Sequence, residues 1–163
     1  MSEADEINRL FKSVDKQNAP PTDVEKLRQF LGKYPLLSSV TGDLAKQVQQ
    51  EIIGRAYSTQ TVRALSVEAY CQHQRNELGF ETATPLEKSL IAHVVLCWLR
   101  LYVTELRYES RMEENLSLAQ GAYWEKKLSA NQRRYLRSIE TLARIRKLQI
   151  NLQINVAHQQ IVT

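Results

Sequence analysis

The strongest constraint in this sequence is a run of more than 28 residues after Pro85 that contains no glycine and no further proline. The run opens on Thr-Pro-Leu-Glu at 84–87, which combines an N-cap threonine, a proline in the first turn and a glutamate at the third helical position. Apolar residues then recur at helical spacing: Leu90, Val94, Cys97, Trp98 and Leu101. The run therefore predicts a long core helix, with Trp98 and Leu101 buried.

A second long helix is predicted to follow almost at once. Ser117 and Gln120 have the spacing of a capping box, and the helix they open can extend to about Leu148, roughly 45 Å at 1.5 Å per residue. The short connection makes the two helices antiparallel neighbours, so we expect a long hairpin over 84–148. The whole sequence has only five glycines and four prolines, which favours a few long elements and an all-α helical bundle around this hairpin.

Shorter helices are expected before the hairpin. Residues 1–33 predict a small helical hairpin, in which a break at 18–21 separates a first helix from a second one that opens at Thr22 and ends at Gly32. Two further helices are predicted over 43–57 and 59–78, the latter capped by Ser58 and closed by Gly79. We expect residues 1–148 to form a single helical domain, because the N-terminal hairpin is too small to bury its own faces.

The C-terminal residues 149–163 change period. Four apolar residues, Ile150, Leu152, Ile154 and Val156, alternate with Asn151, Gln153, Asn155 and Ala157. This alternation predicts a short β-strand. A lone strand needs other strands, so we expect these four residues to mediate homo-oligomerisation or to bind a protein partner. The alternative is a disordered terminus whose alternation is accidental.

Positive charge is concentrated in the last predicted helix. Residues 117–148 contain eight Lys/Arg and two acids, whereas the rest of the chain has a net charge of −2. Four of these side chains fall within about 40° of one another around the helix and form what we call the basic ridge: Lys126, Arg133, Arg137 and Arg144. Lys127 and Arg134 flank it. We expect these six residues to contact nucleic-acid phosphates with little sequence specificity; the alternative is a solvated helix face.

Other classes of function have weaker support. The sequence has no glycine-rich phosphate loop, nucleophile elbow or paired-histidine box, so we expect no enzyme, no catalytic residue and no cofactor. His93 and Cys97 share a helix face, but their spacing is not that of a zinc site, and we expect no metal. The most apolar run, 90–103, is too short for a membrane span. With two cysteines and no apparent secretory signal, the chain is expected to be soluble and cytoplasmic.

The order of parts resembles the small terminase subunits of tailed phages. The hairpin pattern over 84–148 and the alternating tail over 149–156 carry this resemblance, which implies a ring-forming protein that binds DNA and closes a barrel with its C-terminal strands. The stretches 123–125, 133–136 and 142–146 also look like uncharacterised bacterial proteins of mobile-element type. We therefore expect a non-catalytic, homo-oligomeric accessory protein that binds nucleic acid. The alternative is a protein–protein adaptor or assembly scaffold that uses the last helix and the tail.

Overall fold

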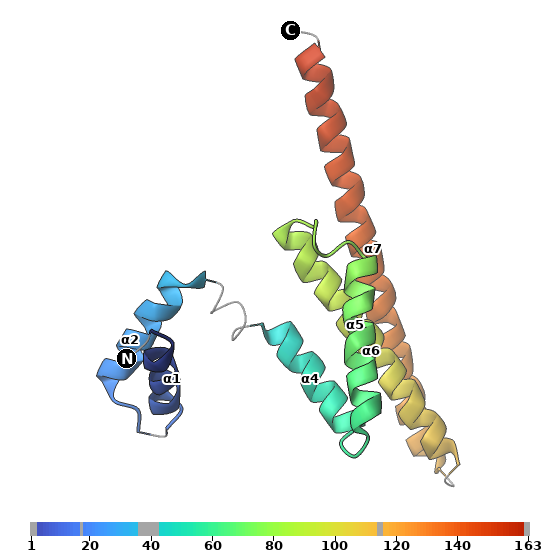
Figure 1. The fold of residues 1–163 in the computed structure, drawn as a ribbon. Coiled ribbons are helices and arrows are strands. Elements are labelled where there is room, and N and C mark those ends of the chain that lie inside the picture. The colour runs from blue at the N-terminus through green and yellow to red at the C-terminus, as the bar shows by residue number, and fades with distance from the viewer. Residues whose placement is uncertain (1–2, 17, 36–42, 114–115, 162–163) are drawn as a thin grey trace. The chain divides into compact units, whose positions relative to one another are not determined.

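The structure is a computed structural model that describes residues 3–16, 18–35, 43–113 and 116–161 (Figure 1). Within these ranges the chain forms six α-helices and no strand: α1 (Glu3–Val14), α2 (Pro21–Lys33), α4 (Leu44–Ala56), α5 (Thr61–Glu77), α6 (Pro85–Met112) and α7 (Leu118–Ile161). The all-α class is thereby confirmed. The chain divides into two compact units, residues 1–44 and 45–163. The expectation of one helical domain over residues 1–148 stays a prediction.

The first unit is the small hairpin of α1 and α2. The side chains of Leu10 and Leu27 are buried in it. Helix α2 begins at Pro21, one residue before the expected start at Thr22, because the fixed φ of proline and its missing N–H suit the first helical position. Gly32 lies inside α2, so the helix end predicted at that glycine is wrong; the C-cap is Tyr34, whose N–H donates to the carbonyl of Phe30.

Helix α6 is the centre of the second unit. Five buried residues join it to α4 and α5: Ile53, Cys71, Val95, Leu99 and Val103. A second cluster of Ile91, Val94 and Leu142 joins it to α7. Leu101 is buried as expected, whereas Trp98 is only partly buried at the edge of the first cluster. The core of this unit therefore wraps around α6.

Contacts between α6 and α7 confirm the antiparallel hairpin. Near the connection, the Tyr108 hydroxyl donates to Glu125 at 2.9 Å. Farther along, the Asn131 amide donates to the Thr104 hydroxyl at 3.0 Å. At the far end, Arg146 Nε lies 3.3 Å from Glu87 Oε1. Residue numbers thus fall along α6 while they rise along α7, and these two helices form the longest interface in the unit.

Local start and stop signals fix most helix ends in this unit. The Thr84–Glu87 capping box is complete, with the Thr84 N–H donating to the Glu87 carboxylate at 3.0 Å. Ser117 and Gln120 form the second box expected from the sequence. Gly79 has a φ of 75°, which an L side chain rarely adopts, as a glycine closing α5 should. Helix α5 begins at Thr61 with Gln60 as its N-cap, so the cap predicted at Ser58 is wrong.

The C-terminal strand expected over 149–163 is not formed in the described residues. Helix α7 continues without a break through residues 150–156 to Ile161 (Figure 1, red). The physical reason is that this stretch has no glycine or proline, and a helix satisfies its backbone hydrogen bonds internally, whereas a strand would need a partner strand. The strand predicted from the alternation of apolar residues is therefore wrong, and these residues follow the helical period.

Helix α6 also has the length and composition of a membrane-crossing segment, and it is the one described helix that does. Its buried apolar side chains pack against α4, α5 and α7 in the two clusters described above. Other apolar side chains of the same helix, Leu86, Tyr102 and Leu106, are exposed.

Candidate functional site

The basic ridge is a solvent-exposed face of α7. Lys126, Arg133, Arg137 and Arg144 are all exposed. Glu140 is exposed as well, and it follows Arg137 by three residues and precedes Arg144 by four, so it lies beside both on the helix surface. The ridge is therefore a convex strip that includes a carboxylate.

A second set of cations surrounds a hollow between α4, α6 and α7. This hollow has a volume of about 420 Å³, and we call it the basic groove. Five of its lining residues are cationic: Arg55 from α4, Arg100 and Arg107 from α6, and Lys127 and Arg134 from α7. Its other lining residues are Ile52, Val103, Thr104, Ala130 and Asn131. Three helices thus direct positive charge at one concave surface.

The helical register of the hairpin brings these cations together. Arg100 and Arg107 are seven residues apart on α6, and Lys127 and Arg134 are seven apart on α7, so each pair stays on one helix face. The hydrogen bond between Asn131 and Thr104 fixes the register of the two pairs at the floor of the groove. Thr104 in turn donates to the carbonyl of Arg100 at 2.7 Å.

Helix α4 is tied to the same groove by Arg107. The Arg107 Nη2 donates to the backbone carbonyl of Arg55 at 3.3 Å, near the C-terminal end of α4. A cation is favourable there, since the last carbonyls of a helix carry partial negative charge. Arg55 itself pairs with Glu51 at 3.1 Å, and both side chains are exposed, so this pair contributes little to stability.

The electrostatic character of the groove comes from the absence of acids in its lining. None of the described residues that line it is an aspartate or a glutamate. Clefts lined by one sign of charge concentrate the field, because their walls have a low dielectric constant. The groove is therefore suited to an anion, and the fork-shaped guanidinium of arginine suits phosphate in particular.

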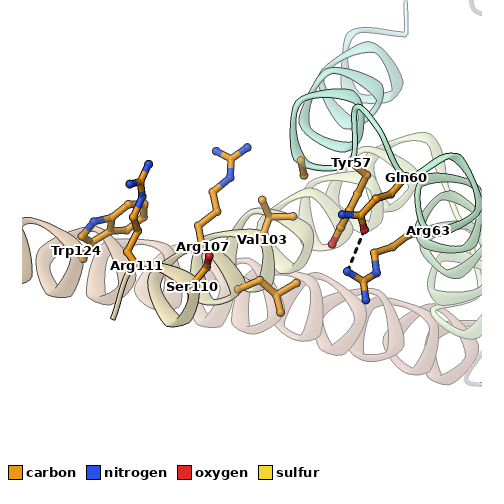
Figure 2. A pocket seen from close by; sticks show the side chains of 10 residues that line it. Tyr57, Gln60, Arg63, Val103, Arg107, Ser110, Arg111 and Trp124 are labelled. Atoms are coloured by element: carbon orange, nitrogen blue, oxygen red, sulfur yellow. Dashed lines mark hydrogen bonds between the residues drawn. The ribbon is translucent and has the colours of Figure 1, made fainter. Parts of the chain in front are cut away.

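A second hollow continues the groove toward the hairpin connection. It has a volume of about 610 Å³, shares Val103 and Arg107 with the basic groove, and we call it the aromatic hollow. Its other lining residues are Ala56, Tyr57, Gln60, Arg63, Leu106, Ser110, Arg111 and Trp124. Figure 2 shows Arg107 between two groups: Trp124 with Arg111 on one side, and Tyr57, Gln60 and Arg63 on the other. It too has no acid among its described lining residues.

A third, smaller hollow of about 280 Å³ adjoins the groove at Arg100, Asn131 and Arg134 and contains His93 and Cys97. The Cys97 sulfur lies 3.5 Å from His93 Nε2. Burial raises the pKa of the Cys97 thiol, which disfavours the thiolate that nucleophilic chemistry needs. The described residues contain no group of three or more His, Cys, Asp and Glu side chains that could hold a metal ion.

The six basic residues predicted from the sequence thus fall on two different surfaces. Four form the exposed ridge, whereas Lys127 and Arg134, predicted as flanks of that ridge, line the basic groove. Arg55, Arg100 and Arg107 were not predicted as site residues. The seven-residue spacing of Arg100 and Arg107 was a usable signal, because it matches that of Lys127 and Arg134 on the antiparallel helix.

Among the residues predicted to mediate oligomerisation, Ile150 is exposed at 56%. The side chains of Leu152, Ile154 and Val156 lie outside the described ones, and their backbone belongs to α7. No protein-family model, curated protein or solved structure matches this chain. The chemistry of the groove is therefore the basis for inferring a function.

Proposed function

We propose that the protein is a non-catalytic accessory protein that binds nucleic acid, and that the basic groove contacts the phosphate backbone. The observation that supports this is the convergence of Arg55, Arg100, Arg107, Lys127 and Arg134 from three helices on a concave surface without an acid in its lining. Arg55 is balanced by its ion pair with Glu51, whereas the other four cations repel one another, and an anionic partner relieves that repulsion. The basic ridge is a secondary surface in this proposal.

Binding of this kind is directed at phosphates. Arginine and lysine neutralise backbone charges and release counterions, so affinity falls steeply with salt. Phosphate contacts position a protein on nucleic acid but carry no sequence information. We therefore expect weak sequence preference and strong salt dependence.

Two matched variants test the proposal. In the groove variant, Arg100, Arg107, Lys127 and Arg134 are replaced by Gln; in the ridge variant, Lys126, Arg133, Arg137 and Arg144 are replaced by Gln. Both lose four positive charges, so the change in net charge is the same. Affinity for random DNA and RNA is measured by fluorescence anisotropy at several salt concentrations, and helix content by circular dichroism.

The salt dependence is the slope of the logarithm of the binding constant against the logarithm of the salt concentration. We expect the groove variant to reduce the magnitude of this slope by up to about 3.6 for duplex DNA, at roughly 0.9 per phosphate contact, and by less for single strands. The ridge variant should change the slope by less than half as much. If the two variants reduced the salt slope equally, the proposed role of the groove would be contradicted. A parent protein that binds no nucleic acid at low salt would leave the adaptor function as the better hypothesis.

Homo-oligomerisation through residues 150–156 and cytoplasmic location stay predictions, as does the relation to small terminase subunits. Because residues 150–156 are helical, any association of copies there would join helices and not strands.

A further inference from the structure

We infer that the basic groove and the aromatic hollow together hold single-stranded nucleic acid, DNA or RNA. In this arrangement the bases lie against Trp124 and Tyr57, and the phosphates follow Arg100 and Arg107 along α6. The inference rests on the proposed function, because it names the class of nucleic acid for the same site. Its carrying observation is that aromatic side chains continue a cationic groove without an intervening acid.

The shape of the surface favours a single strand. The two hollows have volumes of about 610 and 420 Å³, which is the size of sites that hold small ligands, and they are joined at Val103 and Arg107. Such a space accepts the unstacked base and backbone of individual nucleotides. A duplex keeps its bases stacked inside and presents only its backbone, so it cannot fill the aromatic hollow.

The aromatic side chains are placed to serve as stacking surfaces. Trp124 is partly exposed, and its ring centroid lies 6.3 Å from that of Tyr108, which supports it from α6. The Lys127 ammonium lies 5.1 Å from the indole centroid. This ammonium covers part of the ring, and a phosphate that binds Lys127 would draw it away and bring a base within reach of the uncovered indole. Stacking on aromatic rings tolerates every base, which agrees with a site that reads little sequence.

The opposite end of the hollow supplies polar groups. Tyr57 lies there with Gln60 and Arg63, whose side chains share a hydrogen bond of 3.1 Å (Figure 2). Arg107 stands between this end and Trp124, so a cation separates the two aromatic side chains. A positively charged groove combined with aromatic side chains is the usual arrangement for single-strand binding.

The test compares oligothymidylate, oligouridylate and a mixed-sequence DNA duplex as probes for the full chain. We expect one or both single strands to bind more tightly than the duplex, and the two oligomers distinguish DNA from RNA. Trp124→Ala should weaken single-strand binding by roughly 5- to 150-fold, the usual effect of losing one stacked base, and should leave duplex binding within about twofold. Tyr102→Ala is the matched control, since this exposed ring lies on the opposite side of α6 from Arg100 and Arg107.

Two further measurements guard against a folding defect, because Trp124 also packs on Tyr108. Trp124→Phe keeps a ring and should retain single-strand affinity within a few-fold. In a Trp98→Phe protein, Trp124 is the one remaining tryptophan, and single strands should quench its fluorescence. Tighter duplex binding, or unchanged single-strand affinity in Trp124→Ala, would overturn this inference and leave the proposed function intact. Failure of the parent to bind any of the three probes would overturn both.

Discussion

Helix α7 carries basic side chains on two surfaces that differ in what surrounds them. On the basic ridge, four cations lie on a convex face of one helix with Glu140 beside them. In the basic groove, Lys127 and Arg134 of the same helix meet cations from α4 and α6 around a hollow that has no acid in its described lining. The comparison indicates that the field at a surface depends less on the number of charges than on whether they converge on one place. A convex strip is screened by water and salt, whereas a concave surface concentrates its field.

Arg133 and Arg134 offer the sharpest way to break this comparison, because they are neighbours in sequence, both are exposed, and only Arg134 lines the groove. We expect Arg134→Glu to weaken nucleic-acid binding by about tenfold or more, since a hydrogen bond to a charged group contributes roughly 1.5–3 kcal/mol. Arg133→Glu makes the same change in net charge and should cost less than about threefold. Anisotropy titrations at a fixed low salt concentration compare the two. If Arg133→Glu proves the more damaging, the ridge and not the groove is the binding surface.

The groove and the ridge should also differ in how much their residues contribute to stability, and Asn131 tests this. Its amide is buried and donates to Thr104, so Asn131→Ala should lower the free energy of unfolding by about 1–3 kcal/mol. Ridge substitutions such as Arg137→Gln should stay within about 0.5 kcal/mol, because they remove no buried contact. Urea denaturation gives both values. The double variant Thr104→Val, Asn131→Leu removes both hydrogen-bond partners, so it should recover most of the lost free energy of unfolding. A double variant as unstable as Asn131→Ala would contradict the role of this hydrogen bond.

Glu87 gives a smaller, pH-dependent effect at the far end of the same hairpin. Hydrogen bonds from the Thr84 backbone, the Thr84 hydroxyl and Arg146 hold the pKa of the Glu87 carboxyl below its usual value. A carboxyl with a lowered folded-state pKa stabilises the fold above its unfolded pKa and loses that contribution as the pH falls through the folded value. Melting temperatures of the parent and of Glu87→Gln should therefore differ most near pH 7 and converge as the pH falls below about 4. A gap that is constant from pH 7 to pH 3 would count against this account.

Much of the fold follows from local signals in the sequence. The capping boxes at Thr84 and Ser117 and the glycine at 79 each fix a helix end through interactions within a few residues, and all three predictions are confirmed. Two of the predictions that failed concern residues where two local patterns compete. Gly32 lies within α2 because a glycine near a helix end does not oblige the helix to stop. Residues 150–156 alternate as a strand would, yet continuity with a long helix outweighs that period.

The candidate site was only partly predictable. Exposure of the basic ridge follows from the periodicity of a single helix, and it is observed. The basic groove depends on which residues of α6 face which residues of α7, and on where the end of α4 is tied by Arg107. The packing between helices sets these relative positions, and no pattern within a single helix encodes them. Periodicity within one helix therefore placed Lys127 and Arg134 beside the ridge, although they belong to the groove.

Because α7 is unbroken, its C-terminal end projects as a stiff arm from the hairpin. Arg146 contacts Glu87 and the carbonyl of Leu78, and Gln149 also hydrogen-bonds to Glu87. Beyond Gln149, about 18 Å of helix follows to Ile161. A stiff helix held near one point behaves as a lever, here with its pivot near Gln149. A tilt of about 5° around that pivot would move the far end by roughly 2 Å. A small tilt at the hairpin thus becomes a larger displacement at the C-terminal end of α7.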